Sequence, residues 1–251
     1  MKGKVWPGEC NFPDYTNPIV REWWAGLFKE LISDIGVKGV WNDMNEPAVM
    51  EVPNKTFPMD VRHDYDGNPC SHRKAHNIYG TQMARATYHG VKRFAYPKRP
   101  FVITRSAYSG AQRYTSSWTG DNVATWEHLW LANIQVQRMS ISGMGFTGSD
   151  IGGFAEQPTG ELYARWIQLG VFHPFCRTHP SGDHGNQDPW AFDEEVINIT
   201  RKFISLRYQL LPYLYTMFWQ YIEEGIPLLK PLVYFDQDDT ETHYPNDEFS
   251  F

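Results

Sequence analysis

Cysteine is scarce in this sequence. The three cysteines, Cys10, Cys70 and Cys176, are far apart and odd in number, which argues against a disulfide framework and indicates reduced thiols. No apolar run approaches the ~20 residues of a membrane-spanning helix, and residues 1–8 contain no apolar signal core. We therefore expect no membrane partner and a cytoplasmic location.

Long runs of one charge are also missing. The chain has 23 basic and 29 acidic residues, a net charge of −6, spread without clusters. This balance is untypical of proteins that bind nucleic acid or anionic membranes, so neither partner is expected. Aromatic residues, in contrast, make up 16% of the chain, with ten tryptophans. That richness fits a globular enzyme with surfaces on which a ligand ring can stack.

Apolar segments alternate with helical patterns along the chain. Helices are expected over residues 17–36, 73–94, 125–142, 160–170 and 193–223, and strands over residues 5–8, 37–41, 101–104, 144–147, 172–179 and 226–235. This alternation predicts an α/β fold with parallel strands, part of a (β/α)8 TIM barrel. About six strands instead of eight indicate that only the second half of the barrel is present, as a partial catalytic domain over residues 1–251.

Three features of the helices can be tested directly. Asn17 is the expected cap of the first helix, with Pro18 at its first position. Apolar residues at helical spacing are expected to face the core from it: Ile19, Trp23, Leu27, Leu31 and Ile35. The last helix should begin at Asp193 and bend or break near Pro212. Residues 47–71 are expected to form a loop that overhangs the strand ends.

Three of the apolar or glycine-rich segments finish in an aspartate: Asp43, Asp121 and Asp150. A parallel barrel gathers the carboxyl ends of its strands on one face, where barrel enzymes keep their chemistry. Asp43 and Asp121 are therefore candidates for a pair of catalytic carboxyl groups, one acting as nucleophile and the other as general acid. Arg105 is a candidate guanidinium for keeping the nucleophile ionised, and Trp118 an apolar wall for the acid.

Each of these residues has an alternative interpretation. Glu46 competes with Asp43 as nucleophile on chemical grounds, Arg105 suits a structural ion pair, and Asp150 suits a turn or helix cap. The tryptophans at the strand ends could be plain core. Two metal sites are conceivable, one formed by His179, Asp183 and His184 and a calcium loop around Asp64 and Asp66, although neither has a recognisable ligand spacing.

The stretch Trp41-Asn42-Asp43-Met44-Asn45-Glu46-Pro47 resembles the nucleophile signature of glycoside hydrolase family 31. Trp118-Thr-Gly-Asp121-Asn, with Arg105 sixteen residues before Asp121 inside Thr-Arg-Ser, is similar to the acid/base motif of that family. The resemblance implies that Asp43 is the nucleophile and Asp121 the general acid/base. It further implies sugar hydrogen bonds from Arg105, Asp150 and His179, and an apolar subsite wall formed by Trp41, Met44, Trp118 and Phe154.

The resemblance also implies a substrate. Met-Asn-Glu-Pro after the aspartate is the form found in α-glucosidases of the family, whereas its α-xylosidases tend to carry Phe-Gly-Glu. We therefore expect a retaining exo-α-glucosidase acting on oligosaccharides without a cofactor or metal, with another family specificity or a catalytically incomplete carbohydrate-binding remnant as alternatives. We expect the family's N-terminal β-sandwich, early barrel strands and C-terminal β domains to lie outside this sequence. The oligomeric state is left open.

Overall fold

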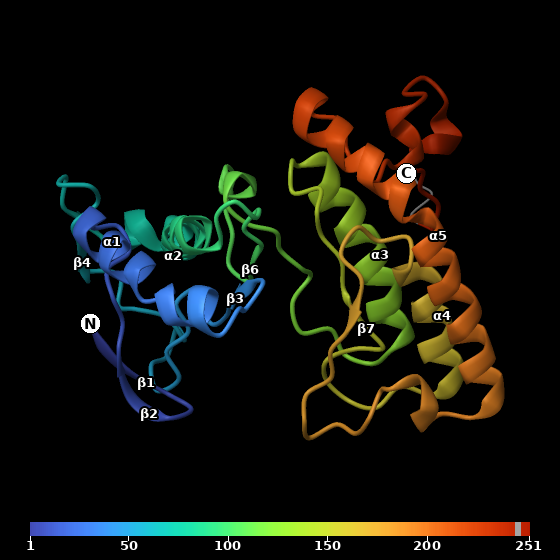
Figure 1. The fold of residues 1–251 in the computed structure, drawn as a ribbon, viewed down its shortest axis with the longest axis horizontal. Helices are drawn as coiled ribbons and strands as arrows, with labels where there is room; N and C mark the ends of the chain where they lie inside the picture. Colours follow the sequence, from blue (N-terminus) through green and yellow to red (C-terminus); the bar gives the residue numbers. More distant parts are fainter. Residues whose placement is uncertain (244–246) are drawn as a thin grey trace. The chain divides into compact units, whose positions relative to one another are not determined.

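The computed structural model describes residues 1–243 and 247–251 and divides the chain into two compact units, Met1–Ser117 and Trp118–Phe251 (Figure 1). Each unit contains one pair of short parallel strands together with helices. Parallel neighbours require a crossover connection of a dozen or more residues, usually a helix, between them. The expected α/β architecture with parallel strands is therefore confirmed in both units.

The first unit is built on one long helix and a parallel strand pair. Its elements are the hairpin β1 (Lys2–Val5) and β2 (Gly8–Asn11), α1 (Pro18–Gly26), a π-helical turn (Glu30–Asp34), β3 (Val40–Asn42), the antiparallel pair β4 (Arg62–His63) and β5 (Cys70–Ser71), α2 (His72–Ala95), β6 (Val102–Thr104) and a 3₁₀ turn (Ala111–Arg113). Strands β3 and β6 pair in parallel. The predictions of α2 and β6 are confirmed, whereas a strand over residues 5–8 is wrong, because Trp6 and Pro7 form the hairpin turn and Gly8 has a left-handed φ of 106°.

Helix α1 packs along α2 (Figure 1). A Cβ on Gly90 would lie 2.6 Å from the carbonyl oxygen of Ala25, so only glycine permits this approach. The indole N–H of Trp24 donates a hydrogen bond to Thr87 Oγ1 at 3.0 Å across the same contact. As predicted, Asn17 caps α1, its side chain accepting hydrogen bonds from the amides of Ile19 and Val20.

The predicted core face of the first helix is wrong. The five apolar residues assigned to it are all exposed: Ile19, Trp23, Leu27, Leu31 and Ile35. The residues that pack against α2 and β6 lie one position further along, at Trp24, Phe28 and Ile32, and repeat at the same spacing of four. Two adjacent apolar stripes with one period cannot be told apart from the sequence, and the partner helix decides which stripe is covered.

The second unit is mostly helical. Its elements are α3 (Trp126–Ile141), β7 (Asp150–Ile151), α4 (Gly160–Gly170), β8 (Arg177–Thr178), a 3₁₀ turn (Pro189–Ala191), α5 (Glu194–Glu224) and 3₁₀ turns at Leu232–Tyr234 and Thr240–Thr242. Strands β7 and β8 pair in parallel. The core lies where α4 meets α5 and β7, around the fully buried Tyr163 and Trp166. The predictions of α3, α4 and α5 are confirmed.

Helix α5 begins and ends within one residue of its predicted bounds. The carboxylate of Asp193 accepts a hydrogen bond from the Val196 amide at 3.0 Å, which caps the helix. The helix then runs without interruption through Pro212 to Glu224 and ends at Gly225, which has a left-handed φ of 75°. A break at Pro212 is therefore wrong. Among the described residues, no helix combines the length and apolarity of a membrane span.

Three predicted strands of the second half differ in the structure. Residues 144–147 are irregular, and the strand lies later, at Asp150–Ile151; residues 172–179 are extended only at Arg177–Thr178. Residues 226–235 form no strand but a single bridge from Lys230 to Ser250 and a 3₁₀ turn. Gly143, directly before the first of these segments, has a φ of 86°, a conformation that a regular strand does not contain.

Candidate active site

Asp43 and Arg105 follow two adjacent parallel strands in register. Asn42 of β3 is the partner of Thr104 of β6, and the Arg105 amide donates a hydrogen bond to the Asn42 carbonyl oxygen at 3.0 Å. The next residue on each strand is therefore delivered to the same edge. Ser116 continues the arrangement on the far side of β6, where it forms a parallel bridge with Ile103. The gathering of functional residues at carboxyl strand ends is thus found in the first unit.

The Arg105 guanidinium lies between two carboxylates. Its Nε is 3.2 Å from Asp43 Oδ1 and 2.9 Å from Glu46 Oε1, and one terminal nitrogen lies 3.2 Å from Glu46 Oε2. The Arg105 side chain is 19% exposed, whereas those of Asp43 and Glu46 are 39% and 37% exposed. Glu46 therefore makes a bidentate contact with the guanidinium, one bond to each of its oxygens, whereas Asp43 makes a single contact.

Met44 stands between the two carboxylates in a strained conformation. Its φ is 56°, in the left-handed region that non-glycine residues seldom occupy. Its backbone amide donates a hydrogen bond to Asp43 Oδ1 at 2.9 Å, and its sulfur contacts Arg105. Strained residues of this kind persist where the surrounding structure fixes them, often at functional sites. The motif thus encodes a sharp turn as well as a carboxylate.

A pocket of about 430 Å³ lies beside Asp43. Its lining comes from the hairpin, the loop before α1, helices α1 and α2 and the motif itself: Val5, Trp6, Cys10, Asn11, Phe12, Pro13, Tyr15, Trp23, Trp24, Asp43, Met44, Asn45, Pro47, Tyr79 and Met83. Asp43 is thus open to a cavity with aromatic walls, whereas Glu46 is not among the lining residues. Trp41, on β3, is 37% exposed and is not among them either.

The loop that carries Asp121 is held by its neighbours on both sides. The Thr119 amide donates to the Gly148 carbonyl oxygen at 3.0 Å, and the Phe154 amide donates to the Asn122 carbonyl oxygen at 2.7 Å. Gly120, with a φ of 85°, makes the turn that presents the aspartate. Asp121 itself is exposed, and Trp118 is 3% exposed. The role of Trp118 as an apolar wall for Asp121 stays a prediction.

Asp150 is fully buried and paired with an arginine. Strand register places it opposite Arg177, whose Nε and a terminal nitrogen lie 3.0 and 2.9 Å from Asp150 Oδ1. The same guanidinium lies over the Trp118 ring, 5.3 Å from its centroid. Arg177 thus joins two of the predicted site residues. The structure gives Asp150 an ion pair, and its contact with a sugar hydroxyl stays a prediction.

Phe154 and His179 are in contact. Their rings stack with centroids 5.5 Å apart and planes 28° apart, and the Ser181 amide donates to the Phe154 carbonyl oxygen at 2.7 Å. Phe154 follows β7 and His179 follows β8, so two residues 25 positions apart in the sequence meet just after these paired strands. Their roles toward a sugar stay predictions.

Neither alternative metal site is formed in the part of the chain that the structure describes. No group of three or more His, Cys, Asp or Glu side chains there is arranged to hold a metal ion. Asp64 accepts a hydrogen bond from the Gly67 amide at 2.9 Å and Asp66 pairs with Arg21, so both acids of the supposed calcium loop have structural partners.

Two residues with a place in these sites were missed by sequence reasoning. Arg177 pairs with Asp150, and Trp6 lines the Asp43 pocket while 67% exposed. Glu46 was considered only as a rival nucleophile, and its contact with Arg105 was not expected. A signal existed for Trp6, since an aromatic residue in a Trp-Pro-Gly turn has no core to enter. The sequence contained no such signal for Arg177. The strand preceding it was predicted at residues 144–147, so its partner Asp150 was not expected within a strand.

Comparison with known proteins decides the family. The model of the glycosyl hydrolases family 31 TIM-barrel domain matches residues 1–217. The chain belongs to this family. Its TIM-barrel fold is shared by a solved structure of the glucosidase II alpha subunit with bound Glc1Man2, which is 38% identical with a TM-score of 0.94 and covers 100% of this chain and 27% of that one. The family 31 alpha-glucosidase of Bacteroides thetaiotaomicron is 38% identical with a TM-score of 0.89, covering 99% of this chain and 40% of that one.

Curated relatives carry glucosidase names. Alpha-glucosidase 2 of Bacillus thermoamyloliquefaciens is 47% identical over 249 residues, 98% of this chain and 31% of that protein. Neutral alpha-glucosidase AB of Homo sapiens is 41% identical over 243 residues, 95% of this chain and 25% of that protein. The chain thus spans about a quarter to a third of the length of these two curated relatives.

Proposed function

We propose that this chain is part of the catalytic domain of a retaining exo-α-glucosidase that releases terminal α-linked glucose from oligosaccharides. The observation that carries the proposal is the position of Asp43. It directly follows a parallel strand, borders an aromatic pocket and lies 3.2 Å from the Arg105 guanidinium. A guanidinium favours the negative charge that a carboxylate nucleophile carries. The glucosidase names of the relatives support the substrate.

The proposed reaction has two displacements. In the first, a carboxylate oxygen of Asp43 bonds to the anomeric carbon, the glycosidic C–O bond breaks, and Asp121 gives its proton to the departing oxygen. In the second, Asp121 takes a proton from water while the water oxygen bonds to the anomeric carbon and Asp43 leaves. Two inversions leave the sugar with its original configuration, and no cofactor takes part.

Asp43 suits the nucleophilic role better than its neighbour Glu46. Both oxygens of Glu46 accept hydrogen bonds from Arg105, at 2.9 and 3.2 Å, whereas only Oδ1 of Asp43 pairs with that side chain. Asp43 also lines the pocket, and Glu46 does not. We assign Glu46 the role of holding Arg105 in place beneath the nucleophile.

The test compares two matched variants of the full-length protein. Asp43→Asn keeps the shape of the side chain and removes the nucleophile, so hydrolysis of an α-glucoside should fall by several powers of ten. Glu46→Gln keeps an acceptor for Arg105 and should retain far more activity. The measurement is kcat/KM for a chromogenic α-glucoside. Substantial turnover by Asp43→Asn, or the reverse order of the two losses, would overturn the assignment.

A further inference from the structure

A chain of four hydrogen-bonded acid and imidazole groups runs through the first unit. His63 Nδ1 lies 2.9 Å from Asp14 Oδ1, His63 Nε2 lies 2.9 Å from His72 Nδ1, and His72 Nε2 lies 2.9 Å from His76 Nδ1. His63 is 3% exposed and His72 is 0% exposed, while His76 is half-buried. We call Asp14, His63, His72 and His76 the histidine chain. None of the four belongs to the proposed catalytic group.

The histidine chain is linked through Asp14 to the loop that forms one wall of the Asp43 pocket. Asp14 lies between Pro13 and Tyr15, both of which line the pocket, but its own side chain turns to His63. Asp14 also accepts hydrogen bonds from the Asp64 amide at 2.7 Å and from the Thr16 hydroxyl at 2.7 Å. Tyr79, a third lining residue, donates from its hydroxyl to the Pro13 carbonyl oxygen at 2.8 Å.

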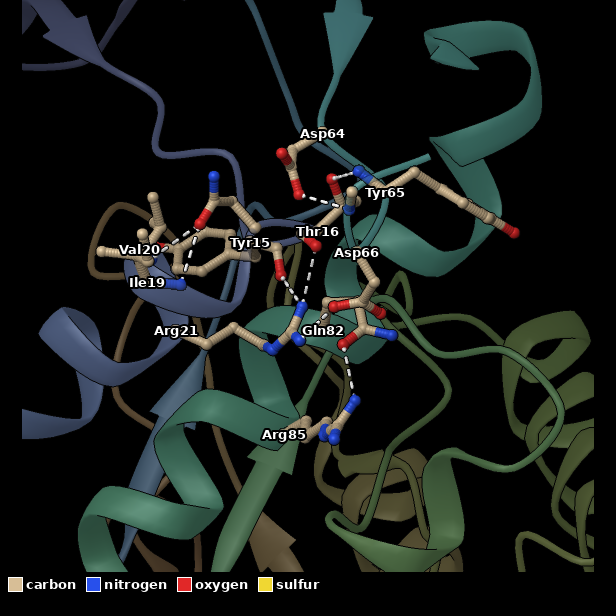
Figure 2. A network of polar contacts seen from close by, with 12 residues as sticks. Tyr15, Thr16, Ile19, Val20, Arg21, Asp64, Tyr65, Asp66, Gln82 and Arg85 are labelled. Carbon is tan, nitrogen blue, oxygen red and sulfur yellow. Dashed lines mark hydrogen bonds and ion pairs between the residues drawn. The ribbon is translucent and has the colours of Figure 1, made fainter. Parts of the chain in front are cut away.

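Further contacts next to the histidine chain join the loop that contains Tyr15 and Thr16 to the loop that contains Tyr65 and Asp66. Figure 2 shows the Arg21 guanidinium pointing at the carbonyl oxygens of Tyr15 and Thr16, each 2.9 Å away, while it pairs with Asp66. The Tyr65 amide donates to Thr16 Oγ1 at 2.8 Å in the same view. Arg21 and Tyr79 thus hold the backbone on either side of Asp14, and the Asp14 carboxylate links the same loop to His63.

The direction of every hydrogen bond in the chain follows from Asp14. Burial raises the pKa of Asp14, but hydrogen bonds from His63, the Asp64 amide and Thr16 hold it well below its usual value, so the carboxylate is ionised and only accepts. His63 must therefore donate from Nδ1. A neutral His63 then accepts at Nε2 from His72 Nδ1, and His72 accepts at Nε2 from His76 Nδ1. At neutral charge all three rings carry their proton on Nδ1.

One added proton fits this chain, and a second does not. A proton that binds Nε2 of the half-buried His76 lets each shared proton move one ring inward, and the positive charge then lies on His63 beside the Asp14 carboxylate. Every contact still contains one proton between two nitrogens or a nitrogen and an oxygen. A second proton would place two N–H groups against each other and break a contact, since each ring has only two nitrogens.

We infer that Asp14, through His63, His72 and His76, is a positioning residue for the wall of the Asp43 pocket, and that the histidine chain takes up one proton without releasing that wall. The claim on ligand binding rests on the proposed function of this pocket. The phenols of Tyr15 and Tyr79 also face these groups, and burial raises their pKa values, so they stay neutral. Burial, with His63 and His76 nearby, lowers the pKa of His72 to about 4.

The proton arrangement is tested without any ligand. Nitrogen NMR of the histidine-labelled protein at neutral pH should show His63, His72 and His76 all protonated at Nδ1. On acidification by one proton, the His72 and His76 signals should change to protonation at Nε2, while His63 becomes protonated at both nitrogens. Protonation of His72 at Nε2 in the neutral chain would overturn the inference, because His63 would then lose either its donor to Asp14 or its contact with His72.

The positioning role is tested by binding of a glucose-mimicking iminosugar. His63→Asn retains an amide donor near the Nδ1 position, whereas His63→Gln places it near Nε2 and loses the contact with Asp14. We expect His63→Gln and Asp14→Leu to bind about tenfold more weakly and His63→Asn to be closer to wild type, since displacement of a binding group by ~1 Å weakens function severely. Glu22→Gln, which breaks an exposed ion pair of α1 with Arg93, is the control.

The outcomes separate the two proposals. Wild-type affinity in folded His63→Gln and Asp14→Leu contradicts the positioning role. Failure of the wild type itself to bind the iminosugar contradicts the proposed function and the claim on the pocket, whereas the NMR result for the proton arrangement is decided independently. Where Asp14→Leu does not fold, the comparison of the two His63 variants decides the positioning role alone.

Discussion

The Arg105 guanidinium lies 3.2 Å from the carboxylate of Asp43, and the two residues follow strands that are hydrogen-bonded in parallel register. This relationship joins positions 62 residues apart in the sequence. Because the two residues follow paired strands at positions in register, the backbone brings their side chains to the same edge of the sheet.

Replacing Arg105 should damage catalysis more than stability. In Arg105→Met, the positive charge beside Asp43 and both contacts to Glu46 are lost. We expect kcat/KM to fall by about 10²–10³, the effect of removing one charge-stabilising donor. Arg105→Lys restores charge without the two-pronged geometry and should recover only part of the loss. Arg113→Met, on an exposed turn of the same unit, is the control, and equal activity in all three variants would contradict the role.

The stereochemistry of the product tests the double displacement. Hydrolysis of an α-glucoside should release glucose first as its α anomer, because two inversions restore the original configuration. Proton NMR recorded within the first minutes, before mutarotation, reports the anomer. A β product would mean a single displacement and would remove the nucleophilic role of Asp43.

Removal of metal ions should leave hydrolysis unchanged. The proposed reaction uses only carboxyl groups, and in residues 1–243 and 247–251 no cluster of three or more metal-binding side chains is formed. After exhaustive dialysis against a chelator, kcat/KM should equal that of the untreated protein. A loss that added Ca²⁺ or Zn²⁺ restores would favour the metal-dependent alternative with His179, Asp183 and His184.

Acid should destabilise the second unit through His173. This ring is 1% exposed, and neither nitrogen has a hydrogen-bond partner among the described residues. Burial, with the nearby Arg207, lowers its pKa to about 3. Between pH 6.5 and 3 the unfolded chain therefore binds a proton that the folded chain does not, and stability falls as the pH falls, by about 5 kcal/mol at most.

The variant His173→Leu isolates this contribution. Leucine fills the site without a titratable group, so its free energy of unfolding should depend less on pH between 6.5 and 3 than that of the wild type. At neutral pH it should be at least as stable, since no hydrogen bond of the ring is lost. His184→Gln, on the loop after β8, is the control. Urea unfolding at several pH values is the measurement, and parallel curves for wild type and His173→Leu would refute the prediction.

Gly148 should not tolerate a side chain. A Cβ there would collide with the Phe175 carbonyl oxygen and lie 2.8 Å from its carbonyl carbon, both backbone atoms that cannot move aside cheaply. Gly148→Ala should therefore destabilise the protein by about 3 kcal/mol or more. Gly182→Ala is the matched control, because nothing lies within 4 Å of its Cβ position. A melting temperature unchanged in both variants would contradict the close approach.

Local sequence patterns were sufficient to predict the positions of the helices. Helix α4 has the predicted bounds and α2 differs by one residue at each end. The capping role of Asn17 and the start of the last helix at Asp193 were also predicted correctly, because a cap and an amphipathic period act within a few residues of each other. The strand before Arg105 was equally legible as a short apolar run. These features depend on neighbours in sequence and so can be predicted from it.

In the candidate site, too, the residues could be predicted from the sequence, whereas not all of their contacts could. The motif around Asp43 identified the residue and its family from the sequence alone. Its pairing with Arg105 was anticipated, but the two-pronged contact of Glu46 with that arginine was not, because a motif states residue types and leaves open which carboxylate a guanidinium meets.

Contacts between segments far apart in the sequence could not be predicted from it and were decided by the tertiary structure. The sequence determined that this chain forms parallel strands and helices, that Asp43 follows one of these strands, and that the chain belongs to family 31. Only the fold decided that Phe28 and not Leu27 faces α2, that Asp150 lies opposite Arg177, and that Asp14 meets His63 across 49 positions. Such pairings depend on the register and packing of elements far apart in the chain, and several registers satisfy the same local pattern equally well.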